Sequence, residues 1–187
     1  MSRKTPTSVP TSASASAATP AAPHRGIVSS SHLVSPRARE TSEFEFGLIV
    51  AWNAFSRWAV RCMAAAGHAD LTITDVLLLH HVNHRARNKK LADICFVLNY
   101  EDTHVVAYSL KKLVSAGMVQ TEKAGKEVLY SPTAAGEAAV QKYREVREQC
   151  LIDNLDSQMN HDIGEVARML RTMSGLYDQA ARAATSL

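Results

Sequence analysis

The sequence of 187 residues has only three cysteines, and they lie far apart. Cys62, Cys95 and Cys150 are odd in number and widely spaced, which argues against a disulfide framework and favours a cytosolic protein with free thiols. No stretch approaches about eighteen uninterrupted apolar residues, so no transmembrane helix is expected. Arg3 and Lys4 are not followed by an apolar segment, so no secretory signal is expected either. We predict a cytoplasmic, nucleoid-associated protein without membrane contact.

Acidic residues are absent from the first 39 positions, and residues 1–36 consist mainly of Ser, Thr, Ala and Pro, with five of the six prolines of the chain. Such a segment has too little apolar surface to offset the entropy of ordering, so we predict a disordered tail. Its basic residues could touch DNA loosely, although a plain solubilising tail is the simpler interpretation.

Sequence signatures of catalysis are also missing. We find no glycine-rich phosphate loop, nucleophile elbow or convincing carboxylate pair, so we expect neither an enzyme nor a cofactor. His80 and His84 are spaced to share a metal, with Cys95 or His161 completing a site, but there is no H-E-x-x-H or paired-cysteine motif. His80 also continues an apolar helix face, so a packed histidine is the preferred interpretation and no metal is expected.

Positive charge is concentrated in part of the chain, although the net charge is only +3. Residues 85–126 hold eight basic and four acidic residues, whereas residues 137–178 hold five basic and eight acidic ones. Segregation of this kind indicates a polyanionic partner that touches only part of the molecule.

Hydrophobic periodicity predicts six helices and one hairpin in the rest of the chain. The first helix follows Ser42 as N-cap and ends at Gly67, with a wide apolar stripe. A second runs from Thr72 or Thr74 to about His84, a third, short one lies within residues 89–99, and a fourth lies within 99–119 with Gly117 as a C′ signal. Alternation over 118–132 predicts a β-hairpin with Gly125 in its loop. Two long helices complete the chain, one from Thr133 to Met159 and one beginning at His161 or Asp162.

Three helices followed by a hairpin are typical of the winged helix, a helix-turn-helix variant. The predicted fold class is therefore mainly α with a small β-hairpin wing. The predicted organisation is a tail (1–36), an N-terminal dimerisation helix (42–68), a winged helix DNA-binding domain (72–132) and C-terminal dimerisation helices (133–184).

Short motifs around the hairpin resemble the MarR family of bacterial winged-helix transcription regulators. The residues that carry the resemblance are Leu91-Ala92, Leu113, Gly117, Met118-Val119 and Thr133-Ala134-Ala135-Gly136. The resemblance covers about residues 42–184, and it extends to a narrower similarity with an alphaproteobacterial subgroup associated with cell-wall L,D-transpeptidase genes. Two positions depart from the family pattern: the wing has no Arg, and Pro132 stands where a Leu is usual. Minor-groove contact by an Arg of the wing is therefore not expected.

The resemblance implies a homodimer that binds double-stranded DNA through the fourth helix and the wing. Large apolar stripes on both terminal helices also require a partner that a small winged helix cannot supply. Residue types that reach bases and phosphates give the predicted contacts: Lys89, Lys90, Thr103, His104, Tyr108, Lys111, Lys112, Lys123 and Lys126. Glu101 and Asp102 are expected in the first turn of the fourth helix, where the helix dipole favours acids.

An aromatic small-molecule effector is a further expectation. Its predicted pocket is lined by Trp52, Phe55, Trp58, His80 and His81, and the alternative for the aromatic residues is dimer core. Cys62, Cys95 or Cys150 could sense redox state, as in some members of the family, but Cys62 and Cys95 lie on apolar stripes and are better explained as small core residues. A winged helix that binds proteins instead of DNA is the alternative function, and the lysines of the fourth helix argue against it.

Overall fold

The computed structural model describes residues 34–187, so the predicted disorder of residues 1–33 lies outside the described part of the chain. The chain divides between Ile49 and Val50 into two compact units, and the winged helix lies wholly within the second. Helix α1 (Arg39–Ala65) begins three residues before Ser42. Ser42 is therefore a buried residue inside the helix, and its prediction as the N-cap is wrong.

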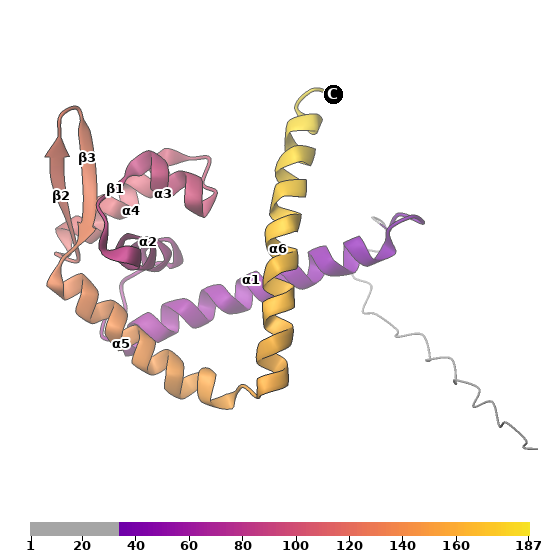
Figure 1. The fold of residues 1–187 in the computed structure, drawn as a ribbon, viewed down its shortest axis with the longest axis horizontal. Helices are drawn as coiled ribbons and strands as arrows, with labels where there is room; N and C mark the ends of the chain where they lie inside the picture. Colours follow the sequence, from indigo (N-terminus) through magenta and orange to yellow (C-terminus); the bar gives the residue numbers. More distant parts are fainter. Residues whose placement is uncertain (1–33) are drawn as a thin grey trace, which may run out of the picture. The chain divides into compact units, whose positions relative to one another are not determined.

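Three short helices follow, α2 (Ile73–Asn83), α3 (Leu91–Leu98) and α4 (Thr103–Ser115) (Figure 1). Thr72, one of the two caps that the sequence left open, begins α2 in a reciprocal capping box with Asp75, and the alternative cap Thr74 lies inside the helix. Asn99 ends α3 in the left-handed conformation, at φ 55°. Asp102 is the N-cap of α4 and accepts a hydrogen bond from the His104 backbone N–H at 2.8 Å. Glu101 therefore precedes the helix, and the prediction of two acids inside its first turn is wrong.

The wing is a hairpin of β2 (Val119–Ala124) and β3 (Glu127–Pro132), with Gly125 at φ 64° in its turn. The predicted hairpin and its end at Pro132 are both confirmed. A third strand, β1 (Lys89–Lys90), pairs with the other edge of β3, so the antiparallel sheet has the order β1-β3-β2. Two residues between helices carry no detectable alternation, which is why the sequence did not predict this strand.

The core of the second unit joins α1, α2, α3, α4 and α5 (Ala134–Cys150). Its largest fully buried side chains include Met63, Leu79, Ile94, Leu110 and Leu113. Cys62 and Cys95 also belong to this core, as predicted.

The turn that joins α4 to the wing is tied to the start of α5. Thr133 caps α5 by accepting a hydrogen bond from the Gly136 backbone N–H, while its hydroxyl donates to the Gly117 carbonyl at 2.6 Å. A Cβ on Gly136 would lie 2.1 Å from the Met118 carbonyl oxygen, so only glycine allows this approach. The Thr-x-x-Gly motif therefore fixes where the chain leaves α4 and enters the wing.

The C-terminal helices differ from the prediction in their bounds. Helix α5 stops at Cys150, a 3₁₀ turn (η3) occupies Ile152–Asn154, and α6 spans Ser157–Ala184 with Asp156 as its N-cap. The predicted continuation to Met159 and the predicted start at His161 or Asp162 are both wrong. The sequence did not predict the break between α5 and α6 because apolar residues continue through it at helical spacing. Aspartates such as Asp156, the N-cap of α6, also occur inside helices and so do not mark a break by themselves. No helix among residues 34–187 is both long and apolar enough to cross a membrane.

Candidate nucleic-acid interface

The surface of α4 opposite the core carries polar side chains at helical spacing. Val106, Leu110 and Leu113 are fully buried and anchor the inner face of the helix. On the outer face, Thr103, His104, Tyr108, Lys111 and Ser115 are all exposed, and 76% of the surface of Tyr108 is accessible. The spacing of 104, 108, 111 and 115 places these side chains along one stripe of the helix. A stripe of hydroxyl, imidazole and ammonium groups on a helix suits contact with base edges and phosphates.

Lys111 and Lys112 are neighbours in sequence with opposite surroundings. Lys111 is exposed, and no hydrogen bond or ion pair of its side chain occurs within residues 34–187. The Lys112 ammonium instead lies 2.7 Å from the Asp75 carboxylate and 2.7 Å from the Asp70 carbonyl oxygen. The structure therefore places the Lys112 side chain in an internal ion pair with α2, whereas Lys111 lies on the exposed face of α4.

Asp75 is the centre of a buried polar network that the sequence prediction missed. It is 2% exposed and accepts hydrogen bonds from the Thr72 backbone N–H at 2.8 Å, the Thr72 hydroxyl at 2.9 Å, the Ser109 hydroxyl and Lys112. Burial works to raise the pKa of Asp75, but the bonds from Lys112, Ser109 and Thr72 together outweigh it and lower the pKa. Because Ser109 and Lys112 belong to α4, the network fixes α4 to the N-terminus of α2. The Thr72-x-x-Asp75 capping box was a visible signal for Asp75, whereas nothing local indicates Ser109.

Lys89 and Lys90 also have partners within the protein. The Lys89 ammonium donates to the carbonyl oxygens of Val82 (2.9 Å), His84 (2.6 Å) and Arg87 (3.5 Å), which closes the C-terminal end of α2. Lys90 lies 2.5 Å from the Glu127 carboxylate, and this contact raises the pKa of Lys90. On the wing, Lys123 and Lys126 are exposed and flank the turn at Gly125.

The residues of the predicted effector pocket have different surroundings in the single chain. Trp52 and Phe55 are about half exposed on α1, with ring centroids 6.1 Å apart, while Trp58 packs against the core. His80 stands edge-on to the Tyr143 ring at 4.4 Å, and its buried Nε2 has no hydrogen-bond partner within residues 34–187. Burial lowers the pKa of His80, so the ring is held neutral. His81 lines a pocket at the C-terminal end of α2.

The three cysteines differ in their burial. Cys62 and Cys95 are buried, and burial is the main cause that raises the pKa of each thiol. Cys150 is exposed at the end of α5. Within residues 34–187, no three His, Cys, Asp or Glu side chains gather in a group that could hold a metal ion.

Comparison with known proteins identifies the fold. Residues 71–136 match the family of winged helix DNA-binding domains, whereas no curated protein matches the sequence. AbfR of Staphylococcus epidermidis is 18% identical, with a TM-score of 0.63 over 75% of this chain and 95% of AbfR. The structure of MarR is 17% identical, with a TM-score of 0.57 over 70% of this chain and 96% of MarR. A MarR-family transcriptional regulator from Rhodococcus sp. RHA1 is 10% identical, with a TM-score of 0.55 over 70% of this chain and 93% of that regulator.

These likenesses establish the fold and nothing finer. The chain has a MarR-like winged helix fold, mainly helical, with an antiparallel three-stranded wing and flanking N- and C-terminal helices, so the predicted fold class is confirmed. None of these structures supports the narrower similarity to an alphaproteobacterial subgroup.

Proposed function

We propose that this protein is a sequence-specific transcription regulator of the MarR type, which binds double-stranded DNA as a homodimer on a pseudo-palindromic operator. The observation that carries the proposal is the exposed polar stripe of α4, fixed to the core from behind and followed directly by the wing. In winged helices, a helix in this position enters the major groove while the hairpin reaches toward the backbone.

The proposed contacts are those predicted residues whose side chains have no partner within residues 34–187. Thr103, His104 and Tyr108 are proposed to reach base edges, since all three are exposed on α4. Lys111, Lys123 and Lys126 are proposed to contact phosphates. Lys89, Lys90 and Lys112 are left out of this set because their ammonium groups already bind carbonyl or carboxylate oxygens of the protein.

Apolar surface on the terminal helices supports the proposed homodimer. None of the 28 residues of α6 is buried within the single chain. Met159, Ile163, Val166 and Met169 are each about half exposed, and Ile49, Val50 and Trp52 of α1 are similarly exposed. A monomer rarely leaves so many large apolar side chains in water, and a second copy of the chain would cover them. Modulation by a small effector is a further part of the proposal, acting through its different affinity for two spacings of the recognition helices.

The test is a fluorescence-anisotropy titration of DNA from upstream of the protein's own coding sequence, repeated over a range of salt concentrations. We expect Lys111→Ala to weaken binding and to reduce the salt slope by about one, because one phosphate contact is lost. Lys112→Met is the matched comparison, and we expect it to leave the slope unchanged. An unchanged slope for Lys111→Ala would contradict the proposed contact. A folded wild-type dimer that binds no fragment of this DNA would favour a protein-interaction module instead.

A further inference from the structure

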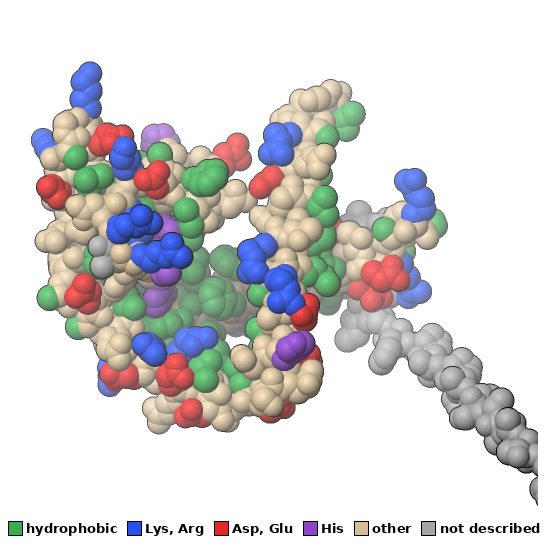
Figure 2. Space-filling view, viewed as in Figure 1, with side chains coloured by type: hydrophobic (Ala, Val, Ile, Leu, Met, Phe, Trp, Pro, Cys, Tyr) green, Lys and Arg blue, Asp and Glu red, His purple; other side chains and the backbone are tan. Residues whose placement is uncertain are grey.

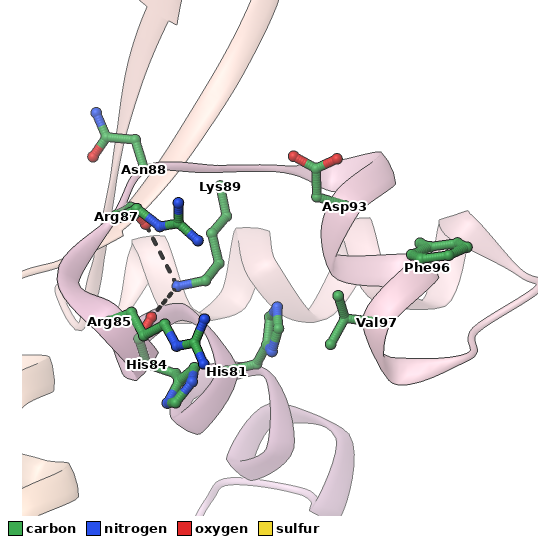
Figure 3. A pocket seen from close by; sticks show the side chains of 9 residues that line it. All are labelled: His81, His84, Arg85, Arg87, Asn88, Lys89, Asp93, Phe96 and Val97. Carbon is green, nitrogen blue, oxygen red and sulfur yellow. Dashed lines mark hydrogen bonds between the residues drawn. The ribbon is translucent and has the colours of Figure 1, made fainter. Parts of the chain in front are cut away.

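A pocket of about 580 Å³ lies between the C-terminal end of α2, the loop that follows it, and α3. Figure 3 shows its two unlike walls. One wall is formed by nitrogen-bearing side chains of α2 and the loop, and the other by Phe96 and Val97 of α3. The basic side chains of the first wall, called here the basic wall, are His81, His84, Arg85, Arg87 and Lys89. In the space-filling view, basic side chains gather beside imidazoles on this face (Figure 2).

Lys89 stabilises the loop that carries the arginines of the basic wall. Its ammonium holds the carbonyl oxygens of Val82, His84 and Arg87, so the loop folds back around it. Arg85 turns the chain in the left-handed conformation, at φ 63°, which is uncommon for a residue with a Cβ. Three hydrogen bonds from Lys89 thus hold the loop from which the two arginine side chains project.

The arginine side chains of this wall have no internal partner. Arg85 and Arg87 are exposed, and their guanidinium groups form no hydrogen bond or ion pair within residues 34–187. Asp93 is the only carboxylate that lines the pocket, and Figure 3 shows it on the α3 side, directed away from both arginines. Counting only Arg, Lys and Asp, two arginines and one lysine against one aspartate leave a formal charge of +2.

The opposite wall is apolar. Phe96 is 87% exposed and Val97 is 61% exposed. A phenylalanine so open to water leaves most of its apolar surface unused, and its flat face is available for stacking. The pocket volume falls within the usual range of small-molecule sites, about 300–1,000 Å³.

We propose that this pocket binds a small phosphate monoester that carries a flat aromatic group. The phosphate lies between Arg85 and Arg87, and the aromatic group lies against Phe96. The charge of the basic wall selects a phosphate monoester over a carboxylate, because a phosphate monoester carries about −1.5 to −2 at pH 7 and has three acceptor oxygens that two guanidinium groups can share, whereas a carboxylate carries −1 and has two.

Proton uptake is an expected consequence of binding. Burial, followed by the nearby charges of Lys89 and His84, lowers the pKa of His81 in the free protein. A dianion beside the ring would reverse this effect, because a nearby negative charge favours the imidazolium form.

The binding test uses the full-length protein without DNA, so its outcome is independent of the proposed function. The probe is 1-naphthyl phosphate, titrated by isothermal calorimetry at low ionic strength. The comparison compounds are inorganic phosphate, 1-naphthol and 1-naphthoate, which provide the dianion alone, the ring alone and a monoanion. We expect 1-naphthyl phosphate to bind at least about tenfold more tightly than each of them.

Variants assign the site. Arg85→Ala and Arg87→Ala should each weaken 1-naphthyl phosphate binding about tenfold, since each removes a charged hydrogen-bond donor. Phe96→Ala should weaken 1-naphthyl phosphate binding while leaving that of inorganic phosphate unchanged. Arg57→Ala, at an exposed position of α1, is the control and should bind like the wild type. Circular dichroism confirms that each variant is folded.

Three results would overturn the proposal. They are the absence of 1-naphthyl phosphate binding, binding of 1-naphthol or 1-naphthoate as tight as that of the phosphate, and unchanged binding by folded Arg85→Ala and Arg87→Ala. If the probe does not bind but both arginine variants weaken DNA binding, the pocket is a contact for DNA phosphates instead.

Discussion

Replacement of Asp75 by Asn tests whether the buried ion pair with Lys112 holds α4 against α2. Asn has the same size but no charge, and it can offer only one acceptor oxygen to the four donors that surround Asp75. Removing one partner of a buried ion pair costs about 3–5 kcal/mol. Because the Lys112 side chain is 32% exposed and can regain water, we expect the lower end, a loss of about 3 kcal/mol in the free energy of unfolding.

A double-mutant cycle separates the ion pair from general damage to the site. Lys112→Met leaves Asp75 with its hydrogen bonds from Thr72 and Ser109, so we expect a smaller loss, of about 2 kcal/mol. The variant with both substitutions should be more stable than the sum of the two losses predicts, by about 1–2 kcal/mol, because the two side chains are in contact. The measurement is urea unfolding followed by far-UV circular dichroism at one fixed protein concentration, since dimerisation would otherwise shift the result.

The pH dependence gives an independent check of the same pair. The folded protein lowers the pKa of Asp75, so this residue contributes its full stability above the ordinary carboxyl pKa, about 4. The contribution is lost as the pH falls through the lowered pKa, and the gap between the wild type and Asp75→Asn should narrow there. Losses that add within about 0.5 kcal/mol in the cycle, or a gap that does not depend on pH, would refute the ion-pair explanation.

Three further predictions concern other parts of the molecule. Because burial lowers the pKa of His80, the unfolded chain takes up a proton below about pH 6.5 that the folded protein resists, so stability should fall with acidification. His80→Phe should flatten that slope in urea titrations between pH 5 and 7.5, and an unchanged slope would assign the effect to another group. Gly136→Ala should destabilise the fold by more than about 2 kcal/mol because its Cβ meets the Met118 carbonyl. Gly164→Ala in α6, where a Cβ meets nothing within 4 Å, should be neutral or stabilising by up to about 1 kcal/mol in the same thermal melts, and similar effects of the two substitutions would exclude the steric cause. Under native conditions a thiol reagent should label Cys150 quickly and buried Cys62 and Cys95 only on unfolding, and a fast reaction of all three, read by mass spectrometry, would contradict the described burial.

Much of the fold was predictable from local patterns. Thr133 was identified as a helix cap, and the cap of α2 was narrowed to Thr72 or Thr74, because an N-cap depends on only a few neighbouring residues. The wing was identified because its alternation and Gly125 are both local signals. The predicted helix starts were wrong where a good capping residue lies within a helix. Ser42 and Asp162 are good capping residues that happen to lie inside helices, since capping preference alone does not define a helix start.

The functional surface was less predictable than the fold. Strand β1 depends on pairing with β3, about forty residues later in the chain, so Lys89 and Lys90 by themselves did not indicate a strand. The sequence indicated only that the segment with Arg85 and Arg87 is basic. The tertiary structure shows that these arginines and Phe96 line the same pocket.

Lys111 and Lys112 show most directly where the information in the sequence ends. The sequence by itself determined the helix, its buried face, its end at Gly117 and the wing behind it, because these depend on periodicity and on residues with special backbone preferences. It assigned the same role to both lysines because their chemistry is the same. The tertiary structure separated them, since each step along a helix turns a side chain by about 100°. That rotation leaves Lys111 exposed to solvent and brings Lys112 to the buried carboxylate of Asp75, thirty-seven residues away in the chain.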